Sequence, residues 1–276
     1  MNIYYKNHLG NTIDLYKWPI MIQNPESLFA YNWEYTSGIS IKRLTAFKKG
    51  INEVDCTISI FAETEEEYNQ VLNSILEITD VDITSESPGK LYYNDYYIDC
   101  YIIAGSYEEW EPDFEATDKK VKIATQNGMW IKETTFPFRW EEQEIDESGK
   151  AYPYNYPYNY GMSTGFSSSI EVESISDMDF ILTIYGYAHN PEVSIGSNTY
   201  KINHEVAPGE ILRINSKEQT AYLIKQNGLT LSMFRYRNKN SWIYEKIPSG
   251  TIPVYWSGAF DFNLLLMEER SEPKWE

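Results

Sequence analysis

Turn residues divide the second half of the chain at intervals of roughly ten residues, and this spacing is what most constrains its fold. The clearest turn signals are Gly196-Ser197-Asn198, Pro208-Gly209, Asn227-Gly228 and Pro248-Ser249-Gly250. No helical periodicity interrupts the intervals, so the segment from Ser167 onward is predicted to be all-β, in the manner of a sandwich. The strand-like runs within it are 168–174, 180–188, 210–214, 220–225 and 242–246.

The C-terminal segment adds a last strand-like run. Residues 251–266 are rich in aromatic and aliphatic side chains with Gly258 in their interior, and a charged tail that closes on Trp275 follows. We interpret this run as the final strand of the sandwich, with the terminal tryptophan held against a surface. Trp256, Gly258, Arg270 and Trp275 are therefore expected to support the fold of the second half rather than any chemistry.

The first half mixes short strands with one clear helix. Thr64 and Glu67 form a capping box, in which each side chain can bond the backbone N–H of the other residue. The apolar residues that follow recur at helical spacing and predict a helix over 65–77 that packs on a sheet. These residues are Tyr68, Val71, Leu72, Ile75 and Ile78.

Other parts of the first half carry local signals of differing strength. Asn94-Asp95 predicts a hairpin turn within 91–103, because both residue types tolerate positive φ. Further strands are expected at 121–124 and from Met129, and a weak helical pattern covers 27–35.

The amino-acid composition of the sequence changes near residue 140. A charged stretch is followed at 152–161 by an imperfect Tyr-Pro-Tyr-Asn repeat, whose prolines favour extended or turn-like backbone. We interpret 141–161 as an ordered Tyr/Pro-rich connector, although its tyrosines could also offer platforms for sugar stacking. The predicted domains are 1–139, which is β-rich with one helix, and 140–276, which is the sandwich.

Charge and composition narrow the possible partners. The net charge of −18 argues against nucleic-acid binding through a basic face and against an anionic membrane surface. No apolar run is long enough to span a membrane. The aromatic content of 16 %, with 24 Tyr and 8 Trp, suits half-buried strands and interfaces with protein or sugar.

The sequence carries no motif of a catalytic or metal site. Cys56 and Cys100 are too few for a disulfide framework and are expected to be buried free thiols. The histidines His8, His189 and His204 lack a ligand spacing, and no nucleophile elbow, Walker loop or dinucleotide fingerprint occurs. We therefore expect no enzymatic activity, no cofactor and no metal ion.

In the order and spacing of several short segments, the chain resembles the distal tail (Dit) proteins of phages or prophages with long non-contractile tails. The segments are 63–76, Gly89-Lys90-Leu91, 99–102, 152–161, 190–200, 209–212 and the closing 270–275. The residues that we take as the structural signature are Trp256, Gly258, Arg270, Pro273 and Trp275.

The resemblance implies a structural virion protein at the tail tip, made and assembled in the cytoplasm of a bacterial host. Its N-terminal domain would form a six-fold ring, possible also as stacked rings, that leaves a channel for DNA. Its C-terminal domain would be a galectin-like β-sandwich. The implied partners are the tail tube protein, the tail-associated tip protein and receptor-binding or baseplate proteins. The alternative function is a carbohydrate-binding module for host-surface adhesion, although the residue set of a galectin sugar site is not visible.

Overall fold

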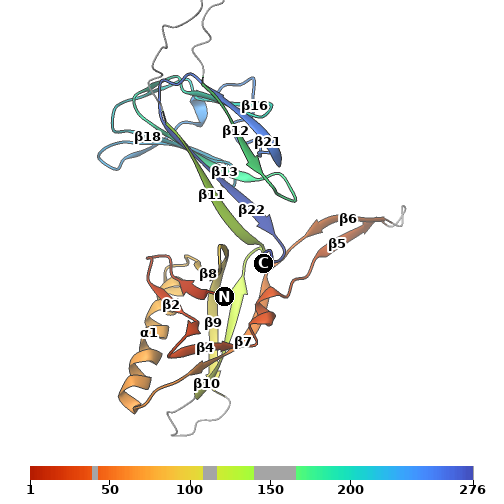
Figure 1. Ribbon diagram of the computed structural model, residues 1–276, viewed down its shortest axis with the longest axis vertical. Helices are drawn as coiled ribbons and strands as arrows, with labels where there is room; N and C mark the ends of the chain where they lie inside the picture. The colour runs from red at the N-terminus through yellow and green to blue at the C-terminus, as the bar shows by residue number, and fades with distance from the viewer. Residues whose placement is uncertain (39–42, 108–116, 140–165, 276) are drawn as a thin grey trace, which may run out of the picture. The chain divides into compact units, whose positions relative to one another are not determined.

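The protein is mainly β, with a single α-helix in the part of the chain that the structure describes (Figure 1). The structure is a computed structural model, and it describes residues 1–38, 43–107, 117–139 and 166–275. The chain forms two compact units: unit 1 is Met1–Lys132 with Glu269–Glu276, and unit 2 is Glu133–Glu268. The division therefore differs from the predicted one at 139/140, and the final residues belong to unit 1. The predicted connector 141–161 lies outside the described residues.

Unit 1 is built on antiparallel strands that follow the order β3-β4-β7-β10-β9, and β9 also pairs with β8 and with the start of β11. β1 continues this arrangement between β8 and β2. Its elements are β1 (Ile3–Lys6), β2 (Thr12–Asp14), β3 (Tyr16–Lys17), β4 (Ile20–Gln23), the 3-10 helix η1 (Pro25–Phe29), β5 (Glu34–Gly38), β6 (Arg43–Lys48), β7 (Asn52–Ile60), α1 (Glu65–Thr84), β8 (Gly89–Tyr93), β9 (Tyr96–Tyr107) and β10 (Thr117–Thr125). β11 (Trp130–Phe138) begins in unit 1 and continues into unit 2 after Lys132.

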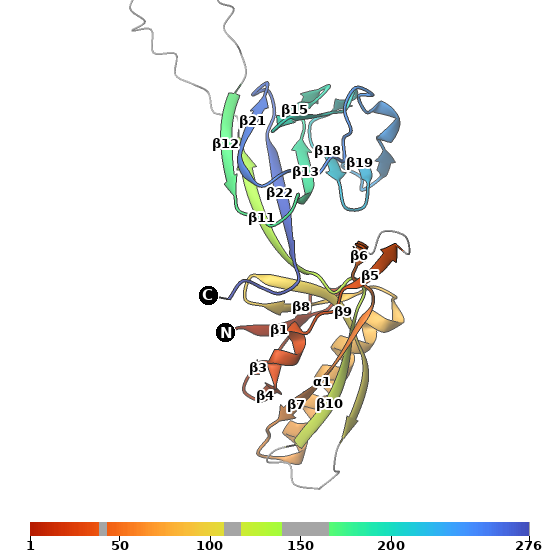
Figure 2. The same ribbon diagram turned by 90° about the vertical axis from the view of Figure 1, so that its right-hand side faces the viewer.

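Helix α1 begins where the capping box predicts and packs against the sheet of unit 1 (Figures 1 and 2). The backbone N–H of Glu67 donates to Thr64 Oγ1 at 3.2 Å. The Glu67 carboxylate accepts from the backbone N–H of Glu63 at 3.1 Å, one residue earlier than the capping box predicts. The helix runs to Thr84 rather than to residue 77, because the polar residues Thr79 and Asp82 continue its buried face.

The other local predictions for unit 1 have mixed outcomes. The hairpin at Asn94 is confirmed, since β8 and β9 pair up to Tyr93↔Tyr96 and Asn94 has a φ of 50°. The strands at 121–124 and from Met129 are confirmed as parts of β10 and β11. The helix predicted over 27–35 is wrong: η1 ends at Phe29, and β5 begins at Glu34.

Cys56 and Cys100 are free and buried, as the sequence predicts. Burial raises the pKa of the Cys56 thiol to about 12, so almost none of it is thiolate at neutral pH. We expect neither thiol to react with Ellman's reagent in the folded protein and both to react in denaturant. A fast-reacting thiol in native buffer would contradict the burial of these side chains.

Unit 2 contains two sheets, with strand orders β20-β19-β18-β13-β22 and β12-β21-β15-β16, and a short β14–β17 pair. Its remaining elements are β12 (Phe166–Val172), β13 (Asp179–Tyr185), β14 (Ala188–His189), β15 (Glu192–Ile195), β16 (Asn198–Lys201), β17 (Glu205–Val206), β18 (Ile211–Asn215), β19 (Thr220–Ile224), β20 (Thr230–Ser232), the 3-10 helix η2 (Phe234–Tyr236), β21 (Gly250–Trp256) and β22 (Phe262–Arg270).

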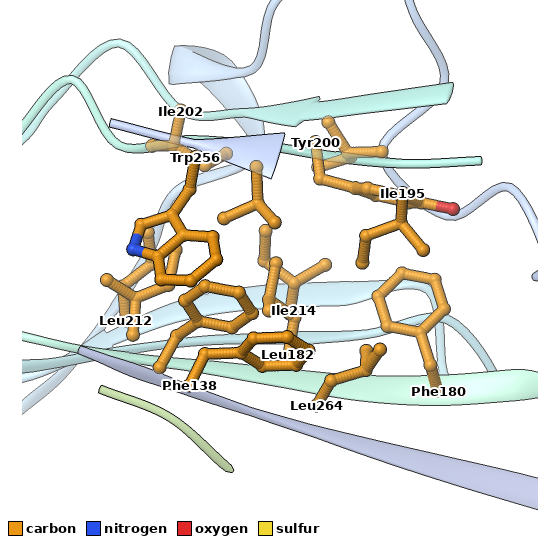
Figure 3. Packing of buried hydrophobic residues seen from close by; sticks show 14 of the residues in the cluster. Phe138, Phe180, Leu182, Ile195, Tyr200, Ile202, Leu212, Ile214, Trp256 and Leu264 are labelled. Atoms are coloured by element: carbon orange, nitrogen blue, oxygen red, sulfur yellow. The ribbon is translucent and has the colours of Figure 1, made fainter. Parts of the chain in front are cut away.

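The core of unit 2 lies between these two sheets, which face each other (Figure 3). Trp256 and Tyr200 come from the four-stranded sheet, and Phe180, Leu182 and Leu264 come from the other. The rings of Phe180 and Tyr200 meet edge to face with centroids 4.9 Å apart. Alternation of buried and exposed residues along the strands therefore produces the two-layer arrangement that the turn spacing predicts.

Two strand predictions for unit 2 need correction. The predicted final strand over 251–266 is two strands, β21 and β22, which belong to different sheets. The chain passes from one to the other through Gly258, whose φ of 75° favours glycine. The predicted strand over 242–246 is a turn, in which the Glu245 N–H donates to the Trp242 carbonyl oxygen at 3.2 Å. Ile243 and Tyr244 are buried there without pairing to a neighbouring strand, whereas Trp242 is exposed.

Candidate assembly surface

Strands β5 and β6 form a separate two-stranded sheet that extends from the rest of unit 1 as an arm (Figure 1). They are antiparallel, with Gly38 opposite Arg43 and Glu34 opposite Lys48. Within the described residues, the two strands pair with each other and with no third strand. Open strand edges are sites where another chain can add a strand.

The residues that lead into the arm have the period of an extended strand. Tyr31, Trp33 and Tyr35 alternate with polar residues, which is the period of an extended strand rather than of a helix. The register shifts between Glu34 and Thr36, as in a β-bulge. A bulge increases the local twist and redirects the side chains that follow it.

The arm exposes large apolar side chains to solvent. Tyr35 is 59 % exposed and Phe47 is 56 % exposed, and their ring centroids lie 6.4 Å apart. Leu44 is exposed on the same hairpin. A cluster of apolar side chains on one exposed hairpin, rather than scattered single residues, is typical of an interaction site. We call Tyr35, Leu44 and Phe47 the arm patch.

The base of the arm is tied to the body of unit 1 by Lys49. Its ammonium donates to the Gly128 carbonyl oxygen at 2.7 Å and lies 4.9 Å from the Tyr31 ring centroid and 5.3 Å from that of Trp33. Burial lowers the pKa of Lys49, and the Glu272 carboxylate opposes part of that shift. These contacts fix where the arm leaves the body.

A buried polar cluster joins α1 to the first strand of unit 1. Asp82 is fully buried and accepts from Tyr5 Oη at 2.5 Å and from the backbone N–H of His8 at 3.0 Å. The Nδ1 atom of His8 also lies 2.5 Å from the same carboxylate. Burial and then the bond to Asp82 raise the pKa of Tyr5 far above its usual range. Asp82 and Tyr5 are buried and His8 closes the cluster at the surface, so the cluster acts as a structural cross-link.

Gly89 completes the packing around this cross-link. A Cβ atom at that position would overlap the Tyr5 hydroxyl and an Asp82 carboxylate oxygen. Asp82 and His8 are 74 residues apart in the sequence. Their meeting depends on the docking of α1 against β1, which no local spacing encodes.

The other candidate chemical groups remain apart. His189 contacts Asn190, and the ring of His204 lies 4.8 Å from that of Tyr236. The carboxylate of Asp179 accepts from Ser216 Oγ at 2.9 Å and pairs with Lys246 at 2.8 Å. The described residues contain no group of three or more His, Cys, Asp and Glu side chains with the arrangement of a metal site. No helix among them is long and apolar enough to cross a membrane.

The five signature residues divide between the two units. Trp256 and Gly258 lie in unit 2, in the core and in the β21–β22 connection. Arg270 ends β22, and it lies in unit 1 together with the buried Pro273 and with Trp275. The chain after Glu268 packs with unit 1, so the expectation that Arg270 and Trp275 support the fold of the second half stays a prediction.

Trp275 lies against a surface of unit 1 and is 59 % exposed. Its ring meets Phe29 and Tyr93 edge to face, with centroid distances of 4.8 and 5.9 Å. Edge contacts of this kind are worth about 0.5–1.5 kcal/mol each, so Trp275→Ala should lower the unfolding free energy of unit 1 by about 1 kcal/mol. The buried Trp256→Ala should cost about 3–5 kcal/mol in unit 2. Urea unfolding, monitored by hydrogen exchange in each unit, measures both losses of unfolding free energy. Equal losses for the two variants would contradict the assignment of Trp275 to an exposed surface and of Trp256 to the core.

Comparison with solved structures gives matches over nearly the whole chain. The Dit protein of phage SPP1, described as a paradigm of the hub adsorption apparatus in phages that infect Gram-positive bacteria, matches with a TM-score of 0.58 and 8 % identity over 98 % of both chains. A chain of the phage P2 baseplate in its activated conformation with Ca matches with a TM-score of 0.58 and 11 % identity over 99 % of both chains. The same baseplate with Sr gives a TM-score of 0.57 at 11 % identity over 99 % of both chains.

The other two comparisons add no relative. No family model matches the sequence, and no curated protein matches it. At 8–11 % identity, the structural matches show the fold and leave the function to be argued from the surfaces of this chain. On its whole described length, then, this chain has the fold shared by the SPP1 Dit protein and a chain of the phage P2 baseplate.

Proposed function

We propose that the protein is a structural component of a phage tail-tip hub and that it assembles with copies of itself into a hexameric ring. The arm is the observation that carries this proposal, because it presents open strand edges and the arm patch to solvent. Two proteins with the same fold are a Dit hub protein and a chain of a phage baseplate.

The contacts that a ring of identical subunits requires can be supplied by an arm of this kind. Identical subunits close into a ring through heterologous contacts, in which one surface of each subunit binds a different surface of its neighbour. A projecting hairpin can supply one of these surfaces by strand addition and by burial of its aromatic rings. In this role, the ring would join the tail tube protein to tip or baseplate proteins and leave a channel for DNA. Unit 2 would be the galectin-like sandwich that offers a docking surface for accessory proteins.

The test is the mass of the full-length protein in solution. We expect light scattering over a concentration series to show a species of six copies, and negative-stain images of that species to show a ring with a central hole. Weak contacts obey mass action, so the ring fraction should rise with concentration. A strict monomer at every concentration would contradict self-assembly through the arm.

The alternative function, adhesion to host-surface carbohydrate, is compatible with the hub. The arm belongs to unit 1, whereas the carbohydrate-binding alternative rests on the C-terminal half. The two activities would therefore use separate surfaces and can be tested separately.

A further inference from the structure

The outer face of the four-stranded sheet in unit 2 carries a single aromatic residue among small hydroxyl side chains. Tyr255 on β21 pairs with Ser167 on one side and with Ser194 on the other, and Ser194 pairs with Thr199. Tyr255 is 51 % exposed, whereas its neighbour Val254 is fully buried in the core. Because side chains alternate between the two faces of a strand, the Tyr255 ring lies on the outside of the sheet.

A groove of about 450 Å³ opens beside this ring. It is lined by His189, Asn190, Glu192, Ser194, Tyr255, Trp256, Ser257 and Phe260. The groove thus combines aromatic surface with a polar rim and has a volume in the range of sites that bind small molecules. A single exposed tyrosine is common on protein surfaces and does not indicate a binding site. A groove that combines this tyrosine with a polar rim does indicate one.

The polar groups at the rim are held in place by their neighbours. The Glu192 carboxylate pairs with Lys201 Nζ at 2.6 Å, across the β15–β16 hairpin. Asn190 Nδ2 lies 3.0 Å from His189 Nε2, and Ser194 Oγ lies 3.0 Å from Thr199 Oγ1. Carboxylate, imidazole, amide and hydroxyl groups together can both donate to and accept from a ligand rich in hydroxyls.

A pyranose ring matches these features. One face of many hexopyranoses is a patch of C–H groups that can stack on an aromatic ring, and their hydroxyls project from the edge of the sugar ring. Glu192 and the overall charge of −18 disfavour a polyanion rich in phosphate or sulfate. The chemistry of the groove therefore favours a neutral sugar.

We propose that this groove binds a neutral hexopyranose unit of a polysaccharide, with Tyr255 as the stacking platform and Glu192 and His189 as hydrogen-bonding partners. An open groove of this kind binds one sugar unit weakly. If the ring of the proposed function forms, six copies on one particle multiply the apparent affinity for a repeating polymer. Binding at one groove does not depend on the ring.

Saturation-transfer NMR on the full-length protein tests the proposal with free sugars at millimolar concentration. The probes are glucose, galactose, N-acetylglucosamine and rhamnose, with glycerol as the acyclic control and inorganic phosphate as the anionic competitor. We expect transfer to the C–H protons of at least one sugar, none to glycerol, and no competition by phosphate. Tyr255→Ala should weaken binding by about tenfold or more, and Tyr255→Phe should retain it because the ring remains.

The matched control is Tyr222→Ala. Tyr222 is 39 % exposed on β19, in the other sheet of unit 2, and it lines a smaller groove of about 190 Å³. This variant should bind sugar as the native protein does, and Glu192→Gln should weaken binding. Unchanged circular dichroism and melting temperature would show that all the variants fold.

Three results would overturn the proposal. The first is that no sugar of the panel shows saturation transfer, the second is loss of binding in Tyr222→Ala but not in Tyr255→Ala, and the third is displacement of the sugar by phosphate. These results can be distinguished from a failure of ring assembly. A protein that stays monomeric but binds sugar through Tyr255 would contradict the proposed ring and leave the proposed sugar site intact.

Discussion

Replacement of Asp82 by alanine should lower the unfolding free energy of unit 1 by about 2–6 kcal/mol, because two donors lose a fully buried acceptor and each loss costs about 1–3 kcal/mol. The carboxylate accepts from Tyr5 Oη and from the His8 backbone N–H, and His8 Nδ1 contacts it as well. Without it, buried polar groups lose their acceptor in the interior, where water cannot replace it fully. Urea denaturation measures the loss, and hydrogen exchange in α1 and β1 assigns it to unit 1.

The control for this substitution is Asp80→Ala. Asp80 lies on the same helix two positions earlier, and its side chain is exposed. Its replacement should change the unfolding free energy by no more than about 0.5 kcal/mol. If the two variants lost the same unfolding free energy, the loss would come from a general effect of alanine in the helix and not from the contacts of Asp82.

The double substitution Tyr35→Ser with Phe47→Ser should abolish ring formation without unfolding the protein. Each aromatic side chain buried at the centre of an interface contributes about 2 kcal/mol or more, so the pair should weaken each subunit contact by about a thousandfold. Both side chains are more than half exposed in the single chain, and neither belongs to a core cluster. Sedimentation velocity and negative stain report the loss of the ring, and the melting temperature reports the fold.

Tyr187→Ser is the matched control for the arm. Tyr187 is exposed to a similar degree, but it lies in unit 2. It should leave the ring intact. If rings persisted in the arm variant, or if Tyr187→Ser dispersed them equally, the arm patch would not be the contact between subunits.

Short-range chemistry explains the successes of the sequence predictions. The start of α1 follows from Thr64 and Glu67, and the β8–β9 turn follows from the φ preference of Asn94. Both Cys residues are buried, as their apolar strand contexts predict. In each case the deciding interactions connect residues that are close in sequence, so a pattern of few residues is sufficient.

The start of the arm carries a local sequence signal for an extended strand. The weak helical pattern over 27–35 competes with the alternation of Tyr31, Trp33 and Tyr35, and the alternation is the correct period. Gly38 at the end of β5 supports a hairpin as well. The exposure of the arm patch could not be inferred, because apolar residues at a strand period normally predict a buried face.

The sequence by itself determines that this chain is mainly β, that one helix begins at the Thr64 cap, and where most of its turns lie. These features depend on backbone preferences and on periodicity within about ten residues. Only the tertiary structure decides that the residues after Glu268 pack with unit 1, and that Asp82 meets Tyr5 and His8. It also decides that 251–266 divides between two sheets and that Tyr255 lies beside a groove. Such contacts join residues far apart in the chain, and their free energy depends on burial and on geometry that no local pattern contains.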